Sequence, residues 1–141
     1  MRFMIIRKAD ADTEAGKMPS TELLEAMIQY NEALVKAGVM RAGEGLHPTS
    51  NAVRVEFSKG EPRVVAGPFG DPKDLIAGFT IIEVASREEA LAWVKRWPRE
   101  DADGEARLEL RQIFEADDFG DEFTPALREQ EERLRVQVEK K

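Results

Sequence analysis

His47 is the only histidine in the chain, and its imidazole is the side chain with the most versatile chemistry at neutral pH. It lies near Glu44 and Ser50, in a segment where Pro48 predicts a loop. An imidazole in this position can bind a ligand, or it can act as a general base if a carboxylate orients it. The alternative interpretation is a histidine that only packs against the loop or caps it, so His47 is a candidate site residue.

A second segment, from Ala66 to Asp74, has the composition of a binding loop. Its glycines and prolines favour a stiff turn in which Gly67-Pro68-Phe69 presents backbone amides and an aromatic ring. Asp71 and Lys73 add charge at its edge. A purely structural turn is the alternative. Two aspartates without further oxygen ligands are only a weak indication of a cation site.

The composition removes several kinds of site. The chain has no cysteine, which excludes disulfides, thiolate nucleophiles and cysteine-ligated zinc. One histidine cannot build a multi-histidine metal centre. The sequence also lacks a phosphate-binding Gly-Lys loop, a dinucleotide fingerprint and a haem-ligand arrangement. We therefore expect no cofactor and no metal.

Charge and hydropathy restrict the partners and the location. The net charge of −7 and the pI near 4.9 argue against nucleic acid, because phosphate binding depends on clustered lysine and arginine. No apolar stretch approaches the roughly 18 residues of a membrane-spanning helix. The short apolar run at the start does not resemble a signal peptide. These features predict a cytoplasmic protein that binds neither membranes nor nucleic acids.

The elements that would position the candidate loops follow from hydrophobic periodicity. Apolar spacing predicts a helix from Thr21 to Ala37, ended by Gly38, and a capping box at Ser86 and Glu89 begins a second helix. Extended segments are predicted at 3–6, 39–46, 52–57, 63–66, 76–84 and 108–113, with a polar loop at 10–18 and a hairpin turn at 58–62. The order strand, helix, strands, helix, strand predicts a ferredoxin-like α+β fold with an extra hairpin.

The chain is expected to divide into a domain over residues 1–113 and a tail over 114–141. The tail is acidic and contains Phe114, Phe119 and Phe123, and Thr124-Pro125 has the residues that begin a helix. Aromatic residues in an acidic segment favour docking onto the domain itself or onto a partner. A disordered tail is the alternative.

A sheet with helices on one face leaves its other face to be covered. The apolar residues that alternate along two of the predicted strands indicate such a face: Val53, Val55, Phe57, Phe79 and Ile81. A second copy of the chain is the simplest cover. The sequence therefore predicts a homodimer.

Several segments in combination resemble the YCII-related family, and more closely its branch named for an Asp-Gly-Pro-Phe motif. They are 43–48, 53–55, 66–69 with Lys73, 75–79, 89–93 and 108–111, within residues 1–113. The resemblance implies a ferredoxin-like domain that dimerises into an α/β barrel and has a cleft between or beside the sheets.

The resemblance also implies a histidine and an aspartate that act as a pair in the cleft. In this chain Ala66 occupies the position of the motif's aspartate, so that mechanism is not carried over. Asp71 or Glu44 is the remaining candidate to orient the histidine. Some members of the branch are encoded near extracytoplasmic-function sigma factors, which implies a regulatory role as an alternative.

Three functions remain as hypotheses. The first is binding of a small molecule in a cleft lined by His47, Phe69, Lys73 and Arg111, with Glu44, Ser50, Gly67 and Pro68 also contributing. The second is a regulatory module that contacts a protein partner through its dimer surface and tail. The third is a hydrolase or lyase with His47 as general base and Asp71 or Glu44 orienting it.

Overall fold

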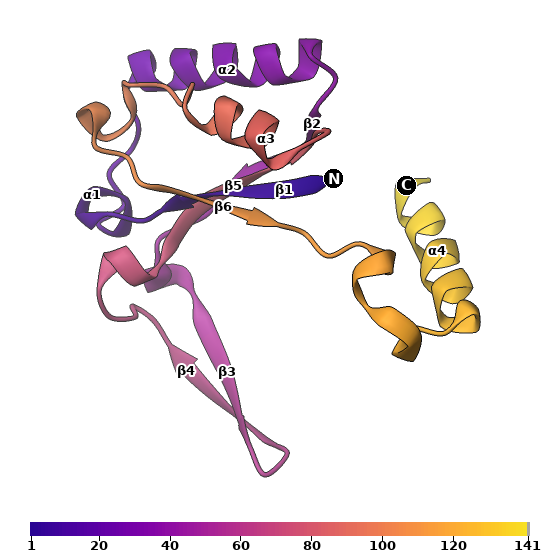
Figure 1. Cartoon of the computed structure of the whole chain (residues 1–141). Helices are drawn as coiled ribbons and strands as arrows, with labels where there is room; N and C mark the ends of the chain where they lie inside the picture. Colours follow the sequence, from indigo (N-terminus) through magenta and orange to yellow (C-terminus); the bar gives the residue numbers. More distant parts are fainter. Residues whose placement is uncertain (141) are drawn as a thin grey trace.

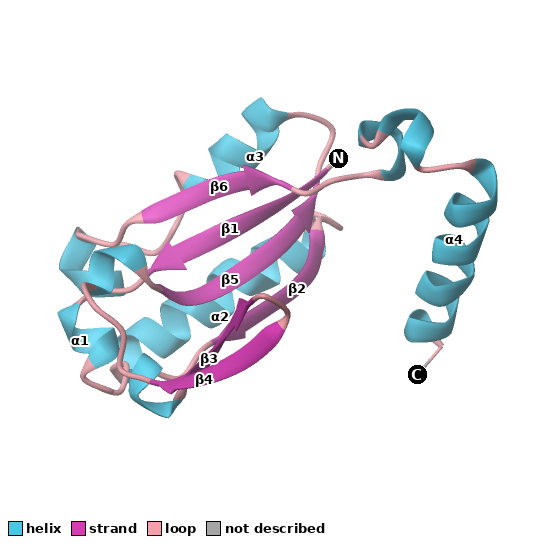
Figure 2. Cartoon of the chain, turned by 90° about the horizontal axis from the view of Figure 1, so that it is seen from below, coloured by secondary structure: helices cyan, strands magenta, loops and turns pink. Residues whose placement is uncertain are grey.

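Strand β1 (Arg2–Lys8) runs through the middle of a four-stranded antiparallel sheet in the computed structural model, which describes residues 1–140. Figure 1 shows the sheet close to edge-on, and the strand order β2-β5-β1-β6 can be followed in Figure 2. The other three strands are β2 (Met40–Gly45), β5 (Ile76–Glu83) and β6 (Leu108–Gln112). This order is the one expected for a ferredoxin-like α+β fold, so the predicted fold class is confirmed.

Helices α2 (Thr21–Lys36) and α3 (Arg87–Val94) cover one face of this sheet (Figures 1 and 2). Each begins at a serine whose hydroxyl accepts a hydrogen bond from a backbone amide of the first turn. Ser20 accepts from Leu23 N at 3.1 Å, and Ser86 accepts from Glu89 N at 3.1 Å. Both predicted helix starts are confirmed. Among the described residues, no helix has both the length and the apolar character needed to cross a membrane.

The hydrophobic core lies between these helices and the sheet. Leu34 and Ile82 are completely buried, as is Ile5 in the central strand. The core residues are Phe3, Ile5, Tyr30, Leu34, Val39, Ile82, Val84 and Ala90. The Tyr30 hydroxyl donates to the Trp93 carbonyl oxygen at 2.7 Å, which ties α2 to α3.

The prediction of a loop over residues 10–18 is wrong for its first part, because Ala11–Glu14 form the short helix α1. The cause is a capping box: the Asp10 carboxylate accepts from Thr13 N at 2.8 Å, while Thr13 Oγ1 accepts from Asp10 N at 2.9 Å. Two reciprocal hydrogen bonds stabilise this single helical turn. Its sequence has no apolar periodicity from which a helix could be predicted.

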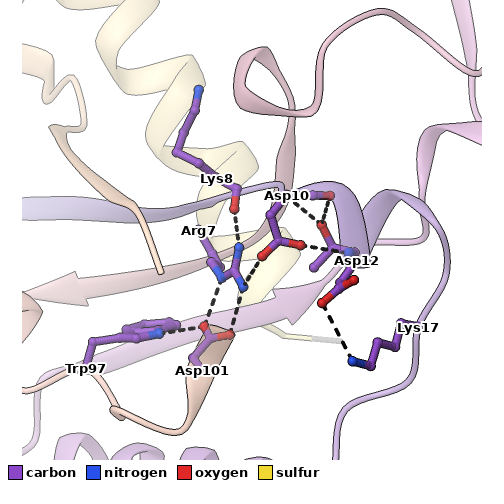
Figure 3. A network of polar contacts seen from close by, with 8 residues as sticks. Arg7, Lys8, Asp10, Asp12, Lys17, Trp97 and Asp101 are labelled. Carbon is purple, nitrogen blue, oxygen red and sulfur yellow. Dashed lines mark hydrogen bonds and ion pairs between the residues drawn. The ribbon is translucent and has the colours of Figure 1, made fainter. Parts of the chain in front are cut away.

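Next to α1 lies a buried ion pair (Figure 3). The Arg7 guanidinium donates to both carboxylate oxygens of Asp101 at 2.8 Å, and Trp97 Nε1 donates to the same carboxylate at 2.9 Å. Arg7 also donates to Asp10 at 3.1 Å and to the carbonyl oxygen of Lys8. The network therefore connects β1 to the start of α1 and to the 3-10 turn Asp101–Gly104.

The extra hairpin is a separate two-stranded sheet made of β3 (Val53–Ser58) and β4 (Glu61–Ala66). It extends away from the main sheet (Figure 1). One of its faces carries exposed apolar side chains, including Val55 (51% exposed), Phe57 (70%) and Val64 (66%). The residues predicted for a single apolar sheet face are thus divided, with Phe79 and Ile81 on β5 and the others on the hairpin.

The C-terminal tail contains two 3-10 turns, Ala116–Asp118 and Gly120–Glu122, and helix α4 (Pro125–Glu139). Phe119 contacts the rings of Phe114 and Phe123, with centroids 5.0 and 5.4 Å apart. Arg2 Nε donates to Glu115 at 2.9 Å and attaches the tail to β1. Helix α4 lies apart from the sheet in both views (Figures 1 and 2), so docking of this helix remains a prediction.

Candidate functional site

The base of the hairpin and the loop that follows β2 border an open hollow of about 420 Å³. Three segments form its wall: the loop between β2 and β3, the start of β3, and the loop between β4 and β5. Its lining residues are Leu46, His47, Pro48, Thr49, Asn51, Ala52, Arg54, Phe69, Asp74, Leu75 and Ile76.

Backbone hydrogen bonds fix these segments to the main sheet and to each other. Leu46 N donates to the Ala77 carbonyl oxygen at 2.8 Å, which attaches the loop after β2 to β5. Gly67 N donates to the Ala52 carbonyl oxygen at 2.9 Å, which joins the two loops of the wall. Between them, Thr49–Asn51 form a 3-10 turn. The wall is therefore held by main-chain contacts.

Gly67 is required by close packing against the 3-10 turn. A Cβ atom added at Gly67 would lie 1.7 Å from the carbonyl oxygen of Thr49. The peptide bond between Gly67 and Pro68 is cis. Only a residue without a side chain allows this approach, so the predicted Gly67-Pro68-Phe69 turn is a structural part of the wall.

Arg54 and Phe69 form a stacked pair inside the hollow. The Arg54 guanidinium carbon lies 3.9 Å from the centre of the Phe69 ring, which is a cation–π contact. Within residues 1–140, eleven ion pairs join an arginine or lysine to a carboxylate, and Arg54 takes part in none of them. Its positive charge therefore stays available to a ligand.

His47 has one hydrogen-bond partner among the described residues, the side-chain amide of Asn51, with Asn51 Nδ2 and His47 Nδ1 3.0 Å apart. An amide NH₂ group only donates, so Nδ1 of His47 accepts. The proton of the neutral imidazole then resides on Nε2, which presents an N–H donor.

The Phe69 backbone is held from the opposite side by Thr49. Phe69 N donates to Thr49 Oγ1 at 3.1 Å, and that hydroxyl donates to Glu14 Oε2 at 2.5 Å. Thr49 N donates to the other carboxylate oxygen of Glu14 at 3.0 Å. The last residue of α1 thus contacts the wall of the hollow.

The remaining lining is mostly apolar and includes one carboxylate. Leu46, Ala52, Leu75 and Ile76 contribute carbon surface, and Asp74 contributes an exposed acidic group. The hollow therefore combines a hydrophobic wall with the donors of His47 and Arg54 and the acceptor of Asp74. Such a mixture is typical of sites for small organic molecules.

The structure brings two of the predicted site residues together, because His47 and Phe69 both line the hollow. Gly67 and Pro68 support it without lining it. Ser50 lies in the adjacent 3-10 turn with its side chain exposed.

Four other predicted residues lie outside the lining. Asp71 caps the 3-10 turn Pro72–Asp74 by accepting from Lys73 N at 3.1 Å, and its carboxylate is 3.8 Å from Lys73 Nζ. Glu44 is exposed on β2, and Arg111 is on β6, the strand at the other edge of the sheet. The sequence placed Arg111 in the cleft, but strands β5 and β1 separate β6 from β2.

The sequence interpretation missed Arg54, Asn51, Thr49 and Glu14. One feature of the sequence could have indicated Arg54, because it is the polar residue between Val53 and Val55 in a strand that alternates apolar and polar residues. Its pairing with Phe69 depends on the β3–β4 register, in which Arg54 lies opposite Val65. Nothing in the local sequence around Glu14 indicates a contact with Thr49, 35 positions away.

Within residues 1–140, no three His, Asp or Glu side chains are grouped so as to hold a metal ion.

This chain is similar to known proteins over part or most of its length. An uncharacterised protein of Rhizobium meliloti (strain 1021) is 38% identical over 61 residues, which are 43% of this chain and 49% of that protein. The chain therefore spans about half the length of this curated relative.

A similar solved structure is 5-chloro-2-hydroxyhydroquinone dehydrochlorinase from Burkholderia phenoliruptrix AC1100, in complex with 2,5-dihydroxybenzoquinone. It is 21% identical, the match covers 81% of this chain and 94% of that one, and the TM-score is 0.46. This degree of similarity does not assign that enzyme's chemistry to the chain.

Residues 1–116, which include the whole sheet, both covering helices and the hollow at the hairpin base, match the YCII-related domain. The chain belongs to the YCII-related domain family.

Proposed function

We propose that this protein binds a small organic molecule in the hollow lined by His47, Arg54 and Phe69. The ligand class follows from the lining: a flat, largely apolar body with a carboxylate or another anionic acceptor group. The apolar body contacts Phe69, Leu75 and Ile76. The acceptor group receives hydrogen bonds from the Arg54 guanidinium and from His47 Nε2.

The observation that carries this proposal is the Arg54–Phe69 stack in a hollow of about 420 Å³. When the flat face of a guanidinium lies on an aromatic ring, its N–H groups stay free at the edges of the guanidinium plane, where they can bind a carboxylate. Because Arg54 has no ion-pair partner within residues 1–140, a ligand anion does not have to displace a carboxylate of the protein.

Asp74 restricts the ligand further. Its carboxylate lines the same hollow and would repel a second negative charge on the ligand. A monoanion that also carries a hydroxyl or amino donor can bond both to the donors of Arg54 and His47 and to the Asp74 carboxylate. We therefore expect hydroxylated benzoates to bind more tightly than benzoate.

Binding is favoured over catalysis by the bonding of His47. A general base needs an unprotonated nitrogen directed at the substrate, and a carboxylate usually orients the ring. Here Nδ1 accepts from Asn51, and neither Asp71 nor Glu44 bonds to the ring. The arrangement presents His47 as a donor to a ligand. The hydrolase or lyase hypothesis lacks a carboxylate that would orient the His47 ring.

The experiment is a titration of the full chain with benzoate, with benzamide as the matched neutral probe. Two-dimensional amide NMR should show benzoate shifting the resonances of His47, Phe69 and their neighbours, and benzamide having a weaker effect. His47→Ala and Phe69→Ala should remove the benzoate effect while the other resonances stay in place. Absence of any shift with benzoate, hydroxylated benzoates and a panel of aliphatic carboxylic acids would contradict the proposal.

The protein acts, in this proposal, as a homodimer. Support comes from Val55, Phe57 and Val64, which expose half or more of their surface on one hairpin face. Phe79 and Ile81 add a half-buried apolar strip on the sheet face opposite the helices. A second copy that covers these surfaces would remove them from water at a gain of about 25 cal/mol per Å².

A second candidate function is interaction with a regulatory protein through the tail. Helix α4 places Leu127, Leu134 and Val138 on one side, and all three are exposed. Deletion of 114–141 should then abolish capture of a partner and leave binding of benzoate unchanged. A truncated chain that loses its fold would assign the tail a structural role instead.

A further inference from the structure

A polar path leads from the buried core to the wall of the hollow. It begins at the Arg7–Asp101 pair and passes to Asp10, whose carboxylate caps α1 (Figure 3 shows this part). The Asp10 carbonyl oxygen accepts from the amide of Glu14, the last residue of α1, at 3.1 Å. Both oxygens of the Glu14 carboxylate then accept from Thr49, one from its amide and one from its hydroxyl. The hydroxyl finally accepts from Phe69 N.

The hydrogen bonds of the Thr49 hydroxyl have a defined direction. A hydroxyl has a single proton, and at Thr49 it is donated to Glu14 over 2.5 Å. The oxygen lone pairs are therefore turned toward the amide of Phe69, 3.1 Å away. A carboxylate that accepts two bonds fixes both the backbone and the side chain of Thr49.

Phe69 is the residue whose position matters most for Arg54, because the guanidinium lies 3.9 Å from the ring centre. The Phe69 amide is the backbone atom that links this residue to the rest of the wall through Thr49. Gly67 already packs against the Thr49 carbonyl oxygen, so Thr49 contacts the loop at two points.

We propose that Glu14 is a positioning residue of the binding site, which sets the orientation of Phe69, and through it Arg54, by way of the Thr49 hydroxyl. This inference rests on the proposed binding function. It extends that function by assigning a residue that does not touch the ligand and lies far from the site in the sequence.

The first test needs no ligand. In Glu14→Gln, one of the two carboxylate oxygens becomes an NH₂ group that only donates, so the side chain no longer accepts from the Thr49 amide on one oxygen and from the Thr49 hydroxyl on the other. Hydrogen exchange of the Phe69 amide should then become at least about tenfold faster, and its NMR resonance should shift. The matched control is Asp12→Asn on the same helix, because Asp12 is exposed and, within residues 1–140, forms an ion pair with Lys17 alone, at 3.7 Å.

The second test separates the hydroxyl from the shape of Thr49. Thr49→Ser keeps the hydroxyl and should retain the exchange rate of Phe69, whereas Thr49→Val keeps the shape and should lose protection as Glu14→Gln does. The same variants are then titrated with benzoate. Affinity should fall about tenfold in Glu14→Gln and Thr49→Val, fall less in Thr49→Ser, which keeps the hydroxyl, and stay unchanged in Asp12→Asn.

The outcomes distinguish the two proposals. Faster exchange at Phe69 in Glu14→Gln, in a chain that binds none of the carboxylates, would support the positioning contact and contradict the binding function. Unchanged exchange and unchanged benzoate affinity in Glu14→Gln would overturn the inference while the binding function stands. Loss of affinity to the same extent in Asp12→Asn would also overturn it, because the effect would then come from charge alone.

Discussion

The guanidinium carbon of Arg54 lies 3.9 Å from the centre of the Phe69 ring, and this contact joins the first strand of the hairpin to the loop that follows the second. The two residues are 15 positions apart, yet they form the polar and the aromatic part of the same wall. In the proposed binding function, this pairing sets the chemical class of the ligand, because it places a cation beside a flat apolar surface.

Arg54→Lys should weaken benzoate binding about tenfold. Lysine keeps the charge but lacks the planar fork that stacks on Phe69 and binds a carboxylate through two N–H groups. Isothermal titration calorimetry measures the change. Arg63→Lys is the control, since Arg63 is on the same hairpin, is exposed, and contacts Glu56 at 3.5 Å away from the hollow. Equal affinity in Arg54→Lys and the unmodified protein would contradict a role for the guanidinium.

Gly67→Ala should disrupt the wall and destabilise the protein by about 1–3 kcal/mol. The added methyl group would lie 1.7 Å from the Thr49 carbonyl oxygen, so one of the two loops must move. Thermal unfolding and the amide spectrum measure the effect. Gly45→Ala is the control, because a Cβ there meets nothing within 4 Å. A native-like spectrum around Thr49 in Gly67→Ala would show that the packing is looser than described.

Asp101→Asn should lower the free energy of unfolding by about 3–5 kcal/mol at neutral pH, because it leaves Arg7 buried without its main partner. Burial by itself would raise the pKa of Asp101, but hydrogen bonds from Arg7 and Trp97 outweigh it and the pKa lies below its ordinary value. A carboxylate whose pKa is lowered by folding stabilises the fold at pH values above its ordinary pKa. This stabilisation is lost as the pH falls through the folded-state pKa.

The stability difference between the unmodified protein and Asp101→Asn should therefore be constant near neutrality and shrink below about pH 4. Urea unfolding over a pH series measures it. The Asp10 carboxylate also faces Arg7 and keeps part of the pH dependence in the variant. Asp103→Asn, an exposed position in the same turn, should follow the unmodified protein. A difference that persists unchanged into acid would exclude the ion pair as its origin.

Tyr30 is the only tyrosine, so a spectrophotometric titration reports its phenol alone. Burial raises the pKa of Tyr30 from 10.0 to about 12. Because the folded-state pKa is the higher one, this contribution to stability is complete below pH 10.0 and is lost as the pH rises toward about 12. The tyrosinate absorbance should therefore develop well above its ordinary midpoint. A midpoint at 10.0 in the folded protein would show that the hydroxyl is accessible to solvent.

Phe57→Asp should convert the proposed homodimer to a monomer or weaken its association by at least about tenfold. Phe57 is 70% exposed in the single chain, and a carboxylate there would oppose burial against a second copy. Sedimentation over a concentration series measures the association. Arg63→Gln, which makes the same change in net charge on the hairpin, is the control. A monomeric unmodified protein at high concentration would refute the homodimer.

The sequence by itself determined the parts of this protein that depend on neighbours in the chain. Ser20, Ser86 and Thr124 each precede a helix, and each hydroxyl accepts from an amide three residues later in the structure. The strands followed from apolar runs and alternation, because these patterns place side chains on one or two faces over a few residues. The family and its fold came from motifs of the same local kind.

The sequence also indicated part of the candidate site, since His47 and the Gly67–Phe69 turn both belong to the wall of the hollow. His47 attracted attention as the only histidine, and the turn because it contains glycine and proline, which have special backbone conformations. It misplaced Arg111, because the position of a strand in a sheet depends on which strands pair, and β6 pairs with β1 instead of approaching β2.

Only the tertiary structure decided the contacts between distant positions. Glu14 has no local feature that sets it apart from the other carboxylates, yet it holds Thr49, and Thr49 holds Phe69. Arg54 became a site residue through the register of the hairpin and the packing of Gly67 on the 3-10 turn. The physical reason is that local free energies select helices, strands and turns, whereas their packing determines which side chains meet.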